Sequence, residues 1–231
     1  MTSFDDSQPV LNRMQRLIDQ WESCSDRRRF FLACYRMMTA NMLAAIERKE
    51  FDDPAWVARL LEHFAEYYFV SLEAYERDPG SACRVWQLAH NLTRSPAAVA
   101  LQLLLVGVNA HINYDLVLAL ADMLGDEWDG FDEAQRASRY ADFCRVNNVI
   151  AQTIDAVQDQ ILEPAMPVMN WVDVLLGPVD ELIISGLINS WRENVWRNTL
   201  LLLAARDPLA RPGLVSKVEQ DALRIGELIA L

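Results

Sequence analysis

Residues 97–124 read AAVALQLLLVGVNAHINYDLVLALADML, and this stretch decides the fold. Up to Val108 it is apolar except for Gln102, and apolar residues resume at Leu116. A helix that is apolar on every side is usually buried inside a protein. We therefore expect a long helix over residues 96–124 that runs through the centre of an all-α fold.

Four polar side chains interrupt this helix at alternate positions, namely Asn109, His111, Asn113 and Asp115. Residues two apart on a helix point about 200° away from each other. The two asparagines are therefore expected on one face, with the histidine and the aspartate on nearly the opposite face. Because an unpartnered buried polar group costs about 1–3 kcal/mol, all four need partners on neighbouring helices.

His111 and Asp115 are four residues apart, so their side chains can meet on one face of the helix. Three interpretations stay open. In the first, Asp115 orients and polarises the imidazole, which acts as a general acid or base. In the second, the two residues supply two ligands to a metal ion. In the third, they belong to a structural network that fixes the packing of the helices.

The rest of the chain repeats the three- and four-residue spacing of apolar residues that is typical of helices. Caps and prolines mark helix starts at Asp26, at Asp53-Pro54 and at Ser95-Pro96. The predicted helices cover residues 8–22, 27–49, 54–77, 81–92, 96–124, 132–162, about 171–176, 178–206 and 212–231. This pattern predicts a single-domain bundle over residues 1–231, with eight or nine helices and with residues 1–7 disordered.

The composition restricts the class of protein. Of the 231 residues, 52% are hydrophobic, and 33 acidic against 21 basic residues give a net charge of −12. This negative charge argues against nucleic-acid binding, which needs a basic face. The longest apolar runs, residues 103–108 and 200–205, are far shorter than the ~20 residues that a bilayer requires. With no recognisable signal peptide, we expect a cytoplasmic protein whose four cysteines are reduced core thiols.

Other sequence motifs do not identify a cofactor. The sequence contains no motif typical of nucleotide phosphates, dinucleotides or a serine nucleophile. His63-x-x-Glu66 has the reverse order of a di-iron E-x-x-H element and has no second copy. Asp155 and Asp159 form a single D-x-x-x-D element, which we interpret as one buried and one solvated acid respectively.

The central helix resembles the hallmark segment of an uncharacterised bacterial all-helical family, a domain of unknown function. The family motif N-A-H-I-N-x-D-L corresponds here to residues 109–116. The resemblance extends to Phe64-Ala65-x-x-Tyr68, to Asp142-Phe143 with Asn147, and to Asp155-x-x-Gln158. It implies a shared helical fold and a shared polar centre, and it brings no established activity. The candidate site residues that it implies are Asn109, His111, Asn113, Asp115, Asp142, Asn147 and Asp155.

These observations favour a small-molecule enzyme with an apolar helical pocket. His111, oriented by Asp115, would transfer a proton in a hydrolysis, an elimination or a proton-triggered cyclisation. One alternative is a non-catalytic helical protein that binds a ligand or a partner through the same fold, with the polar residues as a packing device. A second alternative is a metal-dependent enzyme with His111 and Asp115 as ligands.

The remaining candidates would bind substrate or complete the polar network, and these are Tyr68, Asn109, Asn113, Asp142, Asn147 and Asp155. The expected partner is a small molecule rather than nucleic acid or a membrane. The sequence is also compatible with a homo-oligomer.

Overall fold

A computed structural model describes residues 9–165, 178–205, 207 and 209–231 of the chain. Two predictions, the disorder of residues 1–7 and the short helix near residues 171–176, lie outside these residues. The described residues form helices and no strand, which confirms the all-α prediction.

The α-helices are α1 (Pro9–Ser23), α2 (Arg29–Glu47), α3 (Pro54–Arg77), α4 (Arg84–Leu92), α5 (Ala100–Ala110), α6 (Leu116–Gly125), α7 (Glu133–Val157), α9 (Pro178–Ala204) and α10 (Ala210–Ile229). Two single π-helical turns occur, η2 (His111–Asp115) between α5 and α6, and η4 (Gln158–Leu162) after α7. Short 3-10 turns are η1 (Pro79–Ser81), η3 (Trp128–Gly130) and η5 (Glu163–Ala165).

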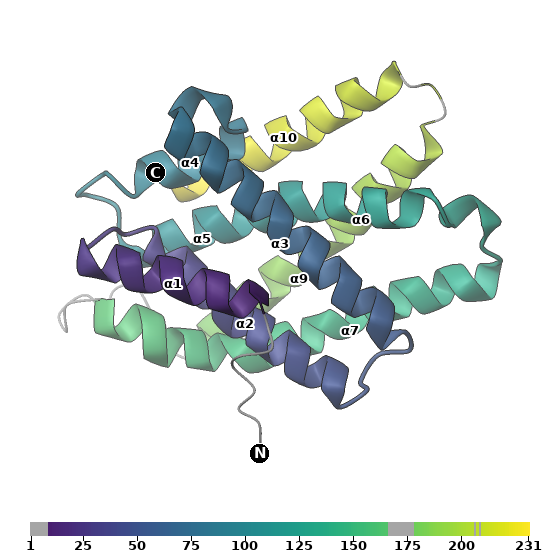
Figure 1. The fold of residues 1–231 in the computed structure, drawn as a ribbon, viewed down its shortest axis with the longest axis horizontal. Helices are drawn as coiled ribbons and strands as arrows, with labels where there is room; N and C mark the ends of the chain where they lie inside the picture. The colour runs from purple at the N-terminus through teal and green to yellow at the C-terminus, as the bar shows by residue number, and fades with distance from the viewer. Residues whose placement is uncertain (1–8, 166–177, 206, 208) are drawn as a thin grey trace.

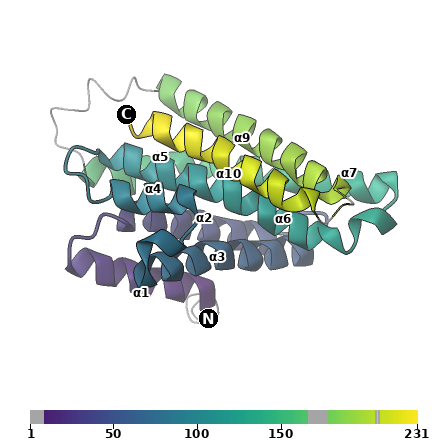
Figure 2. The same ribbon diagram turned by 90° about the horizontal axis from the view of Figure 1, so that it is seen from above.

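The helices surround the segment formed by α5, η2 and α6, which runs through the middle of the molecule (Figure 1). Seen from above, α1, α2 and α3 lie on one side of it, and α9 and α10 lie on the other (Figure 2). Helix α5 contacts α2, α4 and α10, whereas α6 contacts α3 and α9. The predicted central buried helix is therefore confirmed.

This central helix, Ala100–Gly125, is long and apolar enough to cross a membrane by length and composition alone, and its most apolar 18-residue stretch has a mean hydropathy of 1.6. The other helices bury 72% of its most apolar stretch, as expected for the core helix of a bundle. The sequence showed no apolar run of this length, because Asn109, His111, Asn113 and Asp115 divide the apolar residues of this helix into two shorter runs. They do not interrupt the helix itself.

Two predicted helix starts are confirmed by their side-chain caps. The carboxylate of Asp53 accepts the backbone N–H of Trp56 at 2.9 Å, and Pro54 occupies the first turn of α3. Asp132 caps α7 in the same way and accepts the backbone N–H of Gln135 at 2.8 Å.

The predicted start at Ser95-Pro96 is wrong, because the central helix begins at Ala100. The guanidinium group of Arg27 donates hydrogen bonds to the carbonyl oxygens of Ser95 and Ala98. These carbonyl groups are therefore held in a turn that precedes the helix instead of forming its first turn.

The predicted cap at Asp26 is also wrong, because Arg28 occupies the N-cap position of α2 without a side-chain hydrogen bond. The carboxylate of Asp26 accepts the backbone N–H of Arg28 at 2.9 Å and its guanidinium group at 2.7 Å. Asp26 thus stabilises the turn before the helix.

Close packing of α2 on α5 depends on Gly107. A Cβ atom at this position would lie 2.6 Å from Cγ of Phe31, well inside van der Waals contact. Because Phe31 also packs against Trp86 and His111, the missing side chain at Gly107 helps to place the aromatic cluster beside the polar centre.

Candidate functional site

The four predicted polar residues lie at the single π turn in the central helix. In this turn the backbone N–H of Leu116 bonds to the carbonyl oxygen of His111, five residues earlier. Single π turns inside α-helices occur frequently at functional sites. Side chains at the turn are buried, with exposed fractions of 1% for Asn109, 4% for His111, 8% for Asn113 and 1% for Asp115.

The two asparagines bind the central helix to α10. The side-chain amide of Asn113 donates to Oδ1 of Asn109 at 2.9 Å. Nδ2 of Asn109 in turn donates to the carbonyl oxygen of Ala222 in α10 at 2.9 Å. These hydrogen bonds satisfy buried amide groups and fix the contact between two helices, so the geometry gives this face a structural role.

The histidine and the aspartate lie on a different face, where they bond to each other. Nδ1 of His111 lies 3.0 Å from Oδ2 of Asp115, and the indole N–H of Trp86 donates to the same oxygen at 3.0 Å. Phe64 stacks on the imidazole, with ring centroids 3.6 Å apart and planes 8° apart. Nε2 of His111 is buried and has no hydrogen-bond partner among the described residues.

Burial shifts both members of this pair toward their uncharged forms. It raises the pKa of Asp115 well above its usual value, against the opposing effect of the hydrogen bond from Trp86. It lowers the pKa of His111 well below 6.5. With both groups uncharged, a hydroxyl on Oδ2 of Asp115 can donate to Nδ1 of His111, which places the ring proton on Nε2. The pair then stores two protons without a net charge.

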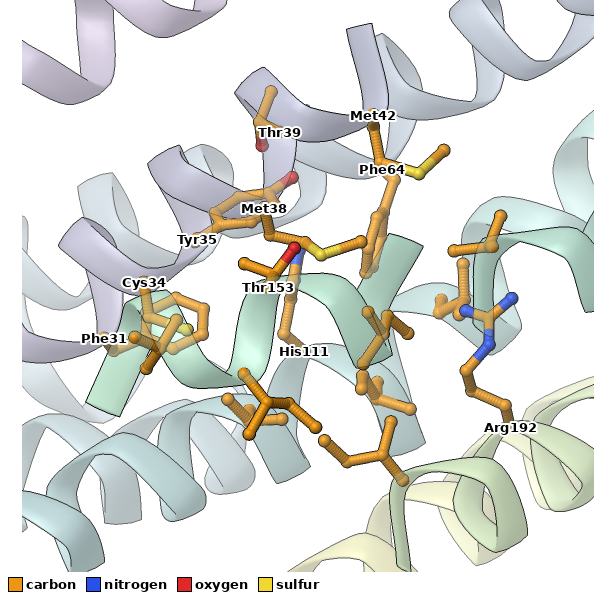
Figure 3. Close-up of a pocket in the computed structure, with 18 of the residues that line it drawn as sticks. Phe31, Cys34, Tyr35, Met38, Thr39, Met42, Phe64, His111, Thr153 and Arg192 are labelled. Carbon is orange, nitrogen blue, oxygen red and sulfur yellow. The ribbon is translucent and has the colours of Figure 1, made fainter. Parts of the chain in front are cut away.

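A cavity of about 200 Å³ lies beside this pair, enclosed by α2, α3, α5, α7 and α9 together with η2 and η4 (Figure 3). Its wall is largely apolar, with side chains such as Met38, Leu104 and Ile150. Such a lining with a few polar groups is typical of small-molecule sites. Four polar atoms of the lining residues have no hydrogen-bond partner in the described part of the chain. They are Tyr35 Oη, Thr39 Oγ1, Trp56 Nε1 and His111 Nε2.

Asp142 lines the same cavity, but its carboxylate is bound to the chain. Its two oxygens accept the backbone N–H groups of Asp52 at 2.7 Å and of Asp53 at 2.8 Å. Arg145 also donates to Oδ1 at 2.6 Å. Asp142 therefore holds the loop that leads into α3.

Asn147 joins α7 to α9, because its Oδ1 accepts the Nε–H of Arg192 at 2.6 Å. Arg192 is buried and contributes to the cavity wall. Arg192 was not among the candidate residues predicted from the sequence. Its sequence neighbours Asn189, Ser190, Glu193 and Asn194 are polar, so no local pattern distinguished it from a surface arginine.

Tyr68 and Asp155 lie outside the cavity wall. Tyr68 is 1% exposed and packs against Trp86 and Phe31, close to the His111 ring. The predicted burial of Asp155 is wrong, because α7 presents this side chain to solvent while Thr153 faces the interior. The structure thus gathers most of the candidates around the central helix and leaves Asp155 at the surface.

Trp86 and Phe64 are the partners of the pair that no sequence signal assigned to it. They come from α4 and α3, which are distant from the π turn in the sequence. Within the described residues, no three His, Cys, Asp or Glu side chains converge in a way that could hold a metal ion.

The comparisons with known proteins identify one family. A model described as a family of unknown function, DUF5995, matches residues 7–231. No curated protein and no solved structure matches the chain.

Proposed function

The chain belongs to the DUF5995 family of unknown function, as its resemblance to an uncharacterised helical family predicted, and we propose its activity from the site. In this proposal the protein binds a small, largely apolar molecule in the cavity and donates a proton to it from Nε2 of His111. The observation that carries the proposal is this nitrogen, which is buried at the cavity wall and has no hydrogen-bond partner in the part of the chain that the structure describes. The opposite ring nitrogen is bonded to Asp115.

The pair can deliver one proton without forming a free imidazolium ion. The proton on Nε2 of His111 passes to the bound molecule, and the carboxyl proton of Asp115 passes to Nδ1. The imidazole ends neutral with its proton on Nδ1, and Asp115 ends as a carboxylate that the indole N–H of Trp86 stabilises. Proton donation of this kind begins an acid-catalysed hydrolysis, elimination or cyclisation.

A ligand reaches Nε2 only when a neighbouring cavity side chain turns aside. The atom is covered, with Phe64 stacked on the ring and the ring centroid of Tyr35 4.3 Å away. Met38 lines the same cavity and is unbranched, so it can change rotamer at low cost. The same coverage favours a second candidate function, in which the cavity binds a ligand without chemistry and the pair fixes the helix packing.

Hydrolysis of butyl vinyl ether tests proton donation directly, because this small apolar molecule reacts through proton transfer to its terminal carbon. Water then adds to the resulting oxocarbenium ion, and the products are acetaldehyde and butanol. We expect the wild-type protein to hydrolyse the ether about 10²–10⁴ times faster than His111→Gln, the usual size of an acid–base contribution. His63→Gln, at an exposed histidine, is the matched control and should react like the wild type.

The result separates the two candidates. Equal rates for wild type and His111→Gln, both folded by circular dichroism, contradict proton donation. If the ether still binds to both proteins in calorimetry, the non-catalytic binding function stands. If His111→Gln unfolds, Asp115→Asn provides the same comparison, since it keeps the shape of the side chain and removes the carboxyl proton.

A further inference from the structure

Arg192 is a buried cation in the wall of the cavity (Figure 3). Its side chain comes from α9, and the residue is only 4% exposed. Nη2 donates to the carbonyl oxygen of Phe143 at 2.6 Å, and Nε donates to Asn147 at 2.6 Å. The guanidinium carbon lies 4.1 Å from the centre of the Phe143 ring. These partners hold the group in position, and all of them are neutral.

Among the residues whose side chains the structure describes (9–165, 184–205, 207 and 209–231), no carboxylate forms an ion pair with Arg192 and Nη1 of Arg192 makes no hydrogen bond. The nearest acid in the sequence, Glu193, is exposed and accepts the hydroxyl group of Tyr140 at 2.9 Å. Asp142 also lines the cavity, but backbone N–H groups and Arg145 occupy its oxygens. The positive charge therefore faces a largely apolar cavity with no carboxylate of the described side chains in contact with it, and the exposed Glu193 acts on it only at a distance.

Burying a charged group is costly unless an opposite charge and hydrogen bonds compensate for the lost water. This cost lowers the pKa of Arg192 to about 10, so the group is still protonated near neutral pH. An anion in the cavity would supply the missing charge and accept a hydrogen bond from Nη1. A carboxylate fits the planar donor array of a guanidinium group especially well.

We propose that the cavity ligand is a small amphipathic carboxylic acid whose carboxylate pairs with Arg192 while its hydrocarbon part lies among the apolar side chains of α2, α5 and α7. This inference rests on the proposed function, since it names the chemical class of the molecule in that cavity. The net charge of −12 repels anions over the protein as a whole. A preference for a carboxylate must therefore come from the local contact with Arg192.

Octanoate and octan-1-ol are suitable probes, because they share an eight-carbon chain and differ in head group. The cavity of about 200 Å³ exceeds the ~150 Å³ apolar cavity that accommodates benzene. Isothermal titration calorimetry at pH 7.5, where octanoate is ionised, gives both dissociation constants. We expect wild-type protein to bind octanoate at least 10-fold more tightly than octan-1-ol.

Two variants test whether Arg192 causes this preference. In Asn147→Asp, a carboxylate replaces the amide that Arg192 already contacts, so the cation acquires an internal partner without losing its position. We expect this variant to stay folded, to bind octan-1-ol as the wild type does, and to lose the preference for octanoate. Arg192→Gln should lose the preference as well. Arg197→Gln, at an exposed arginine of the same helix, is the control and should retain it.

Equal affinities of the wild type for the two probes overturn the carboxylate proposal and leave the proposed function standing. A preference for octanoate that survives in a folded Asn147→Asp variant also overturns it, because the anion then binds elsewhere. If neither probe binds the wild type, both the carboxylate proposal and the use of this cavity as a binding site fail. If Arg192→Gln does not fold, the relative affinities of Asn147→Asp for octanoate and octan-1-ol decide whether Arg192 causes the preference.

Discussion

The rings of His111 and Phe64 lie face to face, with centroids 3.6 Å apart and planes 8° apart. Phe64 thus covers one face of the imidazole, and Asp115 binds its Nδ1. The chemistry available to His111 is confined to Nε2, and access to that atom depends on the aromatic side chains around it.

Replacing Phe64 should make His111 reactive toward a histidine-modifying reagent. In the wild type we expect diethyl pyrocarbonate to modify the exposed His63 quickly and the buried His111 slowly. In Phe64→Ala, the open space beside the ring should raise the modification rate of His111 at least 10-fold relative to His63. Peptide mass spectrometry measures both sites in one sample. An unchanged ratio of the two rates would show that Phe64 does not limit access.

Asp115→Asn should change how stability depends on pH. Because burial raises the pKa of Asp115, its carboxyl group stabilises the fold at low pH, and this contribution falls as pH rises toward its folded-state pKa. His111 has the opposite shift, so its contribution is lost as pH falls below 6.5. Below pH 6.5 the two effects oppose each other, because the unfolded chain ionises Asp115 and protonates His111 where the folded chain resists both changes.

Urea unfolding at pH 5, 6.5 and 8.5 tests this. Wild-type stability relative to Asp115→Asn should fall as pH rises, by up to about 1.4 kcal/mol per pH unit, until the folded-state pKa of Asp115 is reached. Below pH 6.5 the variant should lose stability faster than the wild type, since the effect of His111 is no longer offset. Parallel curves for the two proteins would contradict the shifted pKa of Asp115.

His90 should make the protein sensitive to acid. Burial, together with the positive charge of Arg28, lowers its pKa to about 3. Its contribution to stability is full above pH 6.5 and falls as pH decreases toward 3. His90→Phe keeps an aromatic ring against Trp86 and Tyr75 and removes the titration. Between pH 6.5 and pH 5, the free energy of unfolding should fall by about 2 kcal/mol less in this variant than in the wild type. Urea unfolding measures this difference, and His63→Gln, at a partly exposed histidine, is the control.

Gly107→Ala should destabilise the fold, because the new Cβ would lie 2.6 Å from the Phe31 ring and force it to move. We expect a loss of about 1–3 kcal/mol in the free energy of unfolding, the usual cost of overpacking. Gly186→Ala on α9 is the control, since nothing lies within 4 Å of its added Cβ. That substitution should stabilise the protein by about 0.5–1 kcal/mol through helix propensity. Equal effects at the two positions would contradict the close approach at Gly107.

Asp142→Asn should cost stability without changing the preference of the cavity for octanoate. The amide can no longer accept both backbone N–H groups, of Asp52 and Asp53, and it loses the charge that binds Arg145. We expect a loss of about 1–3 kcal/mol in urea unfolding. Asp155→Asn, at an exposed position on α7, should stay within about 0.5 kcal/mol of the wild type. A lost preference in a folded Asp142→Asn variant would assign Asp142 to ligand binding.

The periodicity of apolar residues predicted most helices, and local chemistry predicted the helix start at Asp53-Pro54. The predicted helix start at Ser95-Pro96 was wrong. The hydrogen bond that holds this turn outside the helix comes from Arg27, which is 68 residues away from Ser95 in the sequence. The contact between His111 and Asp115 was predictable because both lie on one turn of one helix. Residues four apart remain neighbours in the π turn that the sequence did not reveal.

Residue order alone was enough to predict a helical protein, a buried apolar helix, and polar residues on that helix that need partners. These properties depend on the spacing of residues within single helices. The tertiary structure alone decided that Trp86 and Phe64 are the partners of the His111–Asp115 pair and that Arg192 faces the cavity. Such contacts join residues from different helices, and a cavity is the space that their packing leaves unfilled, so neither is encoded in the periodicity of one segment.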